Sequence, residues 1–288
     1  MTNKKSQAPK LHIISGLPRS GSTLLSAILS QNPEIHAGIS YQLLSSILSL
    51  RDVYNSQEAT ALSLVDEKEQ LHIYRQLIAS YYETRRNGRG IVFDTNRIWT
   101  GHLNLLDRLS PESKVVACVR SLEAIVDSVE RIFRQNPFLL PKLFDSPHEW
   151  RSMNSRVDAV LNSNRLIGQP WTALQEAVYS EHSSKVLLVD YDLLATSPLE
   201  VISCIYDFLR IPRYTKHDVN NVELLATEAE KIRKFDENLS APNLHKVEKE
   251  VTYRARQSVL TPDVLEKLKG LNFWRNLQGS DAKLLTRM

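Results

Sequence analysis

Four short runs of apolar, largely β-branched residues recur along the chain, and a helical pattern follows each of them. The runs are Leu11–Ile14, Ile91–Phe93, Val115–Val119 and Val186–Val189. They are almost continuously apolar rather than alternating, which is typical of strands buried on both faces of a parallel sheet. The helical patterns cover Thr23–Ser30, Ile98–Leu109, Leu122–Phe133 and Pro198–Leu209. This alternation predicts an α/β fold with a doubly wound parallel sheet of about four to five strands.

Two long insertions separate the predicted strands. We expect residues 40–86 to form two or more helices, and residues 137–180 to form a lobe containing proline and asparagine, followed by helices. No internal repeat or low-complexity linker divides the chain. We therefore predict a single domain over residues 1–278 and a frayed tail over residues 279–288.

Composition narrows the class of protein. The net charge is only +3, which argues against a nucleic-acid partner. No run approaches the ~20 apolar residues that a membrane-spanning helix needs, and the polar start of the chain does not resemble a secretion signal. Two cysteines, Cys118 and Cys204, indicate neither a disulfide framework nor a metal site, and we expect both in the core. These features favour a cytoplasmic protein and leave a homodimer open.

The segment between the first predicted strand and its helix is a glycine-framed loop. Residues 16–23 read Gly-Leu-Pro-Arg-Ser-Gly-Ser-Thr. A kinase-type P-loop has the same frame but ends in Gly-Lys-Ser or Gly-Lys-Thr, whereas here Ser22 takes the lysine position and the fixed cation is Arg19. Backbone N–H groups, the positive end of the next helix and the hydroxyls of Ser22 and Thr23 favour an anion. Without the lysine, the loop suits a phosphate-linked group with less charge than a nucleoside triphosphate.

A second anion contact follows the third predicted strand. Arg120 ends this strand, and Ser128 lies eight residues later on the next helix, about 12 Å along it by helical rise. An arginine beside a helix hydroxyl can hold a phosphate. Taken alone, Arg120 could equally pair with Glu123 or Asp127. The residues by themselves leave both interpretations open.

Both segments resemble motifs of sulfotransferases that use 3′-phosphoadenosine 5′-phosphosulfate (PAPS). "PRSGSTLL" resembles their 5′-phosphosulfate loop, most of all that of the tyrosylprotein sulfotransferases, and "KVVACVRSLEAIVDSVERIF" is similar to their 3′-phosphate motif. The resemblance implies a P-loop-type fold and Arg120 and Ser128 as 3′-phosphate ligands. It also implies that the 5′-phosphosulfate is held by Pro18, Arg19, Ser20, Gly21, Ser22, Thr23 and Leu24.

Two later segments extend the resemblance. "VLLVDYDLLATSPLEVISCIYDFLRIP" looks like a segment in which a tyrosine contacts the nucleotide, which implies this role for Tyr191. "NLHKVEKE" resembles the family's loop over the nucleotide and places Asn243, His245 and Lys246 there. Lys246 could instead be a solvated charge, since the run 246–250 is highly charged.

The catalytic residues match the family less well. Arg19 is the first candidate for stabilising the transferred sulfuryl group, but the family's catalytic lysine aligns with Thr95, so Arg97 is proposed in its place. The glutamate that follows the loop helix in tyrosylprotein sulfotransferases is absent at Ser40. Asp94 is the best substitute as catalytic base, although it could instead orient Arg97 or cap the next helix. His36 and His102 are weaker candidates for the base.

These features together predict a sulfotransferase that moves a sulfuryl group from PAPS to a hydroxyl of a small molecule, sugar or peptide tyrosine, with no metal ion. Two alternatives stay open at this stage. A degenerate P-loop kinase would use Asp94 or Asp190 to hold Mg²⁺. A non-catalytic nucleotide-binding protein would explain why the family's lysine and glutamate are missing.

Overall fold

A computed structural model describes residues 9–56, 65–135, 143–239, 244–253 and 256–287. Within these ranges six strands form one parallel sheet in the order β2-β3-β1-β4-β5-β6. The strands are β1 Lys10–Gly16, β2 Ile35–Ile39, β3 Ile91–Thr95, β4 Val115–Val119, β5 Val186–Asp190 and β6 Lys283–Leu285. The doubly wound α/β fold predicted from the sequence is confirmed.

The four predicted strands are β1, β3, β4 and β5, and both edge strands are additions to the prediction. β2 is short and contains His36 and Gly38, so it lacks the continuous apolar run of the inner strands. β6 pairs with β5 through residues 283–285, and the prediction of a frayed tail over 279–288 is wrong for this part. Its exposed and half-exposed residues explain why no strand signal is visible there.

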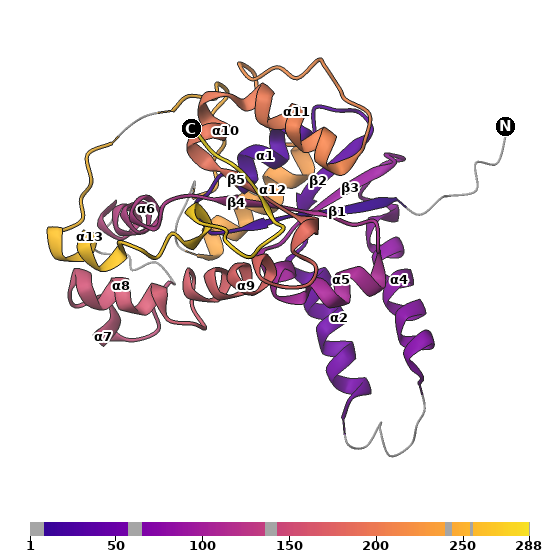
Figure 1. Cartoon of the computed structure of the whole chain (residues 1–288), viewed down its shortest axis with the longest axis horizontal. Helices are drawn as coiled ribbons and strands as arrows, with labels where there is room; N and C mark the ends of the chain where they lie inside the picture. The colour runs from indigo at the N-terminus through magenta and orange to yellow at the C-terminus, as the bar shows by residue number, and fades with distance from the viewer. Residues whose placement is uncertain (1–8, 57–64, 136–142, 240–243, 254–255, 288) are drawn as a thin grey trace.

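Helices cover both faces of the sheet, as Figure 1 shows. They are α1 Ser22–Leu29, α2 Tyr41–Tyr54, α4 Glu67–Glu83, α5 Leu103–Leu109, α6 Leu122–Gln135, α7 Pro147–Trp150, α8 Met153–Leu161, α9 Gly168–Val178, α10 Tyr191–Thr196, α11 Pro198–Leu209, α12 Ala226–Asn238 and α13 Pro262–Leu268. Three 3₁₀ helices are η1 Arg97–His102, η2 Ser183–Lys185 and η3 Phe273–Arg275. None of these described helices is long and apolar enough to span a bilayer.

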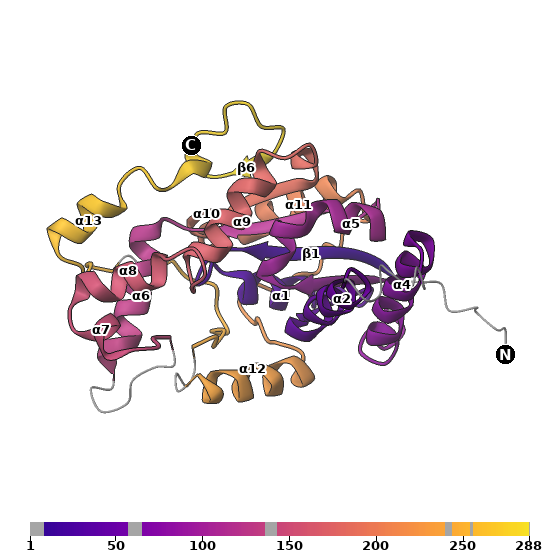
Figure 2. The ribbon, with the colours of Figure 1, turned by 90° about the horizontal axis from the view of Figure 1, so that it is seen from below.

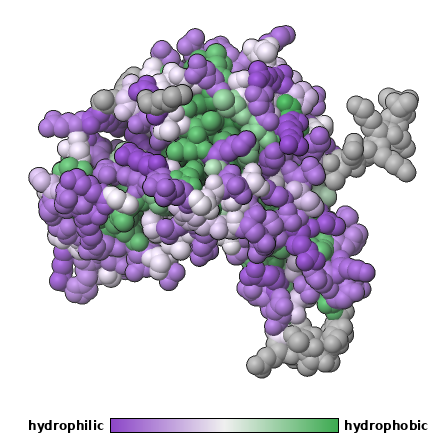
Figure 3. Space-filling model, in the orientation of Figure 1, coloured by the Kyte–Doolittle hydropathy of each residue, from purple (hydrophilic) through white to green (hydrophobic). Residues whose placement is uncertain are grey.

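Successive residues of a strand pack into two separate hydrophobic cores, one on each face of the sheet. Ile13 packs into the core shared with α5, α6 and α9, whereas its neighbour Ile14 packs into the core shared with α1 and α11. This is the two-residue alternation of a strand whose two faces are both covered. Cys118 on β4 is buried as expected, but Cys204 on α11 is exposed. The space-filling view is mostly hydrophilic, with apolar side chains gathered over the region of α1 and α11 (Figure 3).

The two insertions leave the sheet in different places. Residues 40–86 include α2 and α4, which project away from the sheet in Figure 1. Residues 137–180 include α7, α8 and α9.

Helix α12 comes from neither insertion. In Figure 2 it lies on the side of the molecule away from β6, and its Glu228 carboxylate accepts a hydrogen bond from the Ile39 N–H at the end of β2 (3.0 Å).

Candidate active site

A cavity of about 760 Å³ lies at the carboxyl ends of the strands. The carboxyl ends of parallel strands all lie at the same edge of the sheet. The strand order reverses at β1, whose neighbours β3 and β4 lie on opposite sides of it. Sheets of this kind bind ligands at such a point of reversal. Most residues predicted from the sequence line this cavity: Pro18, Arg19, Gly21, Ser22, Thr23, Leu24, Arg97, Arg120, Ser128, Tyr191, His245 and Lys246. Ser20, Asp94 and the weaker candidates His36 and His102 do not line it, and Asn243 lies outside the described residues.

The loop between β1 and α1 needs its glycines. Gly16 has φ 108°, and a Cβ there would lie 2.0 Å from the carbonyl oxygen of Cys118. Gly21 has φ 91°, and a Cβ there would lie 2.8 Å from Cδ2 of Tyr191. The Ser20 hydroxyl donates to the carbonyls of Leu17 (2.5 Å) and Cys118 (2.8 Å). The Ser20 side chain therefore fastens the loop to β4, and a contact of Ser20 with the 5′-phosphosulfate stays a prediction.

The start of α1 faces the cavity. Ser22, Thr23 and Leu24 are its first three residues, and their N–H groups precede the first helical hydrogen bond, which runs from the Leu25 N–H to the Gly21 carbonyl. Gly21 supplies no capping side chain, so these donors are left for a ligand. Their alignment with the helix dipole favours an anion at this point.

Two arginines bring positive charge to the same cavity. Arg19 adopts φ 59°, unusual for a non-glycine residue, and its Nε donates to the Ser128 hydroxyl (3.1 Å) while a terminal nitrogen donates to the Leu244 carbonyl. Burial, and then the nearby charge of Arg120, lowers the pKa of Arg19. The Arg120 guanidinium lies over the ring of Tyr191, 4.3 Å from its centroid. Its buried Nε has no hydrogen-bond partner among the described residues.

This arrangement is unfavourable without a ligand. Two like charges repel each other, and a buried N–H without an acceptor loses its hydration. A bound anion would relieve both costs at once, because it attracts both guanidinium groups and accepts the missing hydrogen bond. The cavity is therefore built for an anion.

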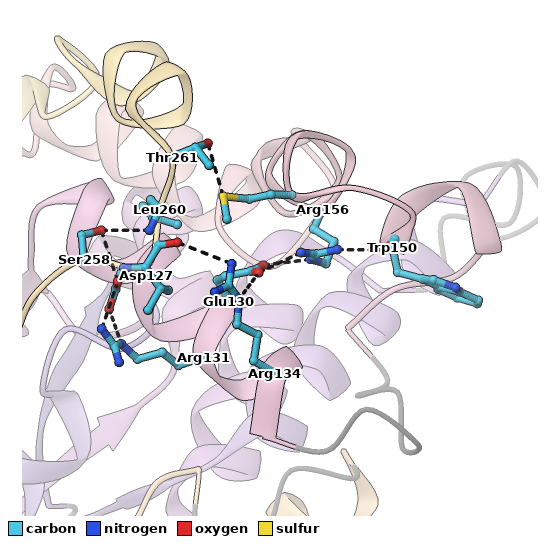
Figure 4. Close-up of polar contacts among 11 residues, drawn as sticks. Asp127, Glu130, Arg131, Arg134, Trp150, Arg156, Ser258, Leu260 and Thr261 are labelled. Carbon is cyan, nitrogen blue, oxygen red and sulfur yellow. Dashed lines mark hydrogen bonds and ion pairs between the residues drawn. The ribbon is translucent and has the colours of Figure 1, made fainter.

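Polar contacts hold α6 in place next to the cavity, and Figure 4 shows these contacts. The Asp127 carboxylate accepts from Arg131 Nε (2.7 Å) and from the Val259 N–H (2.7 Å), which ties the segment after residue 256 to α6. Glu130 is buried and binds Arg134 (2.7 Å) and Arg156 (2.7 Å). Burial alone would raise the pKa of Glu130, but the hydrogen bonds from Arg156 and Arg134 outweigh it and lower the pKa. α6 is thereby locked to α8.

Asp94 does not face the cavity. Its side chain is fully buried, accepts a hydrogen bond from Trp99 Nε1 (2.7 Å) and is also bonded to the Ser40 hydroxyl. Burial raises the pKa of Asp94 to about 6. Its neighbour Thr95 lines the cavity instead, since side chains alternate along a strand. The geometry contradicts the prediction that Asp94 is the catalytic base, and Ser40 serves to hold Asp94 in place.

Arg97 and Lys246 differ in how firmly they are placed. The Arg97 carbonyl accepts from the Ser15 hydroxyl at the end of β1 (3.2 Å), which brings η1 against the loop. Lys246 is more than half exposed and pairs with Glu248 (3.2 Å). The surface-charge alternative for Lys246 thus keeps its support, although the residue lines the cavity.

A second cavity of about 520 Å³ adjoins the first. The two cavities share a wall made of Pro18, Arg19, Asn96, Arg97, Leu244 and His245. The rest of the second cavity is largely apolar and includes Ile98, Val129, Ile132, Leu143, Leu166, Pro170, Ala173, Phe235 and Leu239. Several of these residues come from the insertion 137–180, whereas none comes from the insertion 40–86.

His245 in the shared wall is paired with a carboxylate. Its Nδ1 lies 2.6 Å from Oδ1 of Asp236, and its backbone N–H donates to Oδ2 of the same residue (2.9 Å). Asp236 is buried on α12. This pairing adds a residue, Asp236, that the sequence did not point to, because it lies in a charged helical run with no motif around it.

Comparison with known proteins identifies the family. Residues 12–216 match the model of the sulfotransferase family. The chain belongs to this family. Solved structures similar to this sulfotransferase include the sulfotransferase domain of the Synechococcus PCC 7002 olefin synthase, with 16% identity over 93% of this chain and 96% of that one and a TM-score of 0.47. A mouse sulfotransferase complexed with PAP has 14% identity over 96% and 87% of the two chains and a TM-score of 0.48. A Mycobacterium avium sulfotransferase has 15% identity over 98% and 79%, with a TM-score of 0.46.

Family membership gives the reaction class, and the two cavities differ in chemical character. A sulfuryl transfer has two reactants, a donor and an acceptor. The anion-binding features gather in the first cavity and the apolar side chains in the second. The shared wall is the boundary between these two chemically different cavities.

Proposed function

We propose that the sulfotransferase uses PAPS as its donor and that the larger cavity binds it. In this proposal the 5′-phosphosulfate lies on the loop 16–23 and the start of α1, and the 3′-phosphate lies against Arg120. The observation that carries the proposal is the pair of guanidinium groups, Arg19 and Arg120, that face one cavity while the buried Nε of Arg120 has no partner among the described residues.

The same features argue against a nucleoside triphosphate with Mg²⁺. Ser22 stands where a P-loop kinase has its phosphate-binding lysine. The two aspartates that could have held Mg²⁺ are otherwise engaged: Asp94 binds Trp99 and Ser40, and Asp190 caps α10 by accepting from the Asp192 N–H (2.8 Å). The kinase alternative is therefore not favoured.

Several of the predicted ligands have a specific role in this proposal. Arg19, Arg97 and the first N–H groups of α1 would stabilise charge on the transferred sulfuryl group and on the oxygen that leaves with the phosphate. Tyr191 packs against both Gly21 and Arg120, so it would hold the two phosphate sites at a fixed spacing. Ser128 accepts a hydrogen bond from Arg19, which orients this arginine.

We further propose that the acceptor is a hydroxyl compound with a largely apolar body. The lining of the second cavity supports this, because Val129, Ile132 and Phe235 offer contact surface without charge. The arginines of the shared wall would then face the hydroxyl end of the acceptor.

Calorimetry with 3′-phosphoadenosine 5′-phosphate (PAP), against ATP with Mg²⁺, tests the donor. We expect the protein to prefer PAP, and we expect Arg120→Ala to weaken PAP binding by about 10- to 100-fold, since a charged hydrogen bond contributes about 1.5–3 kcal/mol. Arg213→Ala is the matched control, because Arg213 is an exposed arginine that pairs with Asp207. A preference for ATP with Mg²⁺, or an equal effect of the two substitutions, would refute the proposed donor.

A further inference from the structure

The strongest catalytic arrangement that the sequence motifs do not explain is the pair His245–Asp236. His245 belongs to the wall shared by the two cavities, which the proposed function assigns to donor and acceptor. Nδ1 faces the buried Asp236 carboxylate and therefore carries the ring proton. The opposite nitrogen, Nε2, has no hydrogen-bond partner among the described residues and is left with its lone pair.

We infer that His245 is the general base that removes the proton from the acceptor hydroxyl, and that Asp236 is the positioning residue that fixes its tautomer and orientation. This inference rests on the proposed function, because it needs a donor in the larger cavity and an acceptor in the second. It supplies the base that is missing at Ser40 and that Asp94 cannot provide.

The charges around the ring suit this role. The groups that face His245 are Asp236 from α12, Arg19 from the loop after β1 and Arg97 from η1. Burial lowers the pKa of His245 below its usual value of 6.5, and the two arginines act in the same direction, whereas Asp236 opposes them. The ring is therefore neutral at neutral pH, which leaves Nε2 able to accept a proton.

The chemical step balances without any further reagent. The acceptor O–H gives its proton to Nε2, and the acceptor oxygen attacks the sulfur of the donor. The bond from sulfur to the bridging phosphate oxygen breaks, and its electron pair leaves with PAP. The products are a sulfate ester, PAP and a protonated His245, which returns its proton to water.

Another histidine in the neighbourhood does not meet these conditions. His102 lines the second cavity but not the first, so it lies away from the shared wall. It is the last residue of η1 and the N-cap of α5, and no carboxylate is hydrogen-bonded to its ring among the described residues. His245 is therefore the better placed base.

Asp236→Asn is a sharp test, because both oxygens of Asp236 are used. The His245 backbone N–H can donate only to an oxygen, so the amide oxygen must take the place of Oδ2. The amide –NH₂ then faces Nδ1 and donates to it, which forces the ring proton onto Nε2. All hydrogen bonds stay satisfied, yet Nε2 can no longer accept a proton.

The experiment compares wild type with His245→Gln, Asp236→Asn and the control His72→Gln, an exposed histidine on α4. Long-range ¹H–¹⁵N NMR of the free proteins reads the tautomer of His245. We expect the Nδ1-protonated form in wild type and the Nε2-protonated form in Asp236→Asn. Calorimetry with PAP reports the donor site, and transfer from radiolabelled PAPS to phenol, 2-naphthol, octanol and water reports catalysis.

We expect His245→Gln and Asp236→Asn to lower kcat by about 10²- to 10⁴-fold, the usual contribution of a general base, with PAP affinity changed less than threefold. The wild-type rate should rise with pH through a pKa below 6.5 and then level off, and His245→Gln should lack this limb. His72→Gln should match wild type throughout.

The outcomes separate the two proposals. Failure of wild type to bind PAP refutes the proposed donor. If His245→Gln binds PAP and keeps full activity, the assignment of His245 as the base is refuted, whereas the proposed donor is not. A His245 ring protonated on Nε2 in wild type also refutes the assignment of His245 as the base. The assignment is refuted as well if wild type binds PAP but transfers the sulfuryl group neither to water nor to any of the alcohols.

Discussion

The contact between Gly21 and Tyr191 links the stability of the anion loop to donor binding, and Gly21→Ala tests this link. Gly21 has φ 91°, where an L-residue is strained by about 1–2 kcal/mol. The new methyl group would also lie 2.8 Å from Cδ2 of Tyr191, whereas ordinary contacts begin at 3.4 Å, so the ring must move by about 0.6 Å. Such overpacking costs a further ~1–3 kcal/mol.

Movement of the Tyr191 ring should also reach the donor site. The Arg120 guanidinium lies 4.3 Å from the centroid of that ring, at cation–π distance. We therefore expect Gly21→Ala to lose about 2–5 kcal/mol in free energy of unfolding and to bind PAP about tenfold more weakly. Urea denaturation gives the first quantity and calorimetry the second.

Gly270→Ala provides the control. Gly270 has φ 80°, close to that of Gly21, but a Cβ there would meet no atom within 4 Å. Its cost should be the backbone strain of about 1–2 kcal/mol alone, with PAP binding unchanged. If Gly21→Ala costs no more than Gly270→Ala and binds PAP normally, then Tyr191 does not support the loop and the reasoning fails.

Three further predictions address other parts of the molecule. Glu130→Ala should cost about 3–5 kcal/mol in urea denaturation, since it leaves the buried charge of Arg156 unpaired; a loss below 1 kcal/mol would contradict this role. Asp94→Asn should leave PAP binding intact and remove a pH dependence of stability. Burial raises the pKa of Asp94 from 3.8 to about 6, so as pH rises the unfolded chain releases this proton before the folded protein does. The stability of wild type should therefore fall as pH rises from about 4 to about 6. Equal slopes for the two proteins between pH 4 and 6 would refute this. A thiol reagent should label Cys204 in the folded protein and Cys118 only after unfolding, because burial raises the pKa of the Cys118 thiol to about 12; labelling of both without denaturant would be the contrary result.

The inner part of the sheet was predictable because its strands are covered on both faces. Val115–Val119 reads as a continuous apolar run, and the structure has a strand with the same bounds. The edge strands do not show this continuous apolar run. The edge strand β6 is half exposed, and its pairing depends on the position of β5 rather than on the composition of residues 283–285. The glycine-framed loop was predictable for a different reason, because Gly16 and Gly21 meet local requirements of the turn.

The catalytic centre was only partly predictable. Sequence alone placed Asp94 at the end of a strand, but a shift of one residue decides whether a side chain points to the cavity or to the opposite layer, and here Thr95 faces the cavity. The pair His245–Asp236 joins residues nine positions apart, one on α12 and one beyond its end. No motif in this charged stretch marks the two residues as a pair.

The separate construction of the two cavities has a consequence for how this enzyme can diversify. The donor cavity is assembled from the turns that follow the parallel strands, which the fold itself holds in register. Much of the proposed acceptor cavity comes instead from the lobe within residues 137–180 and from α12, which are not turns at the ends of the strands. Drift in the lobe can therefore change acceptor preference without disturbing donor chemistry. Transplanting this lobe between relatives should carry acceptor choice with it, provided that the six wall residues stay constant.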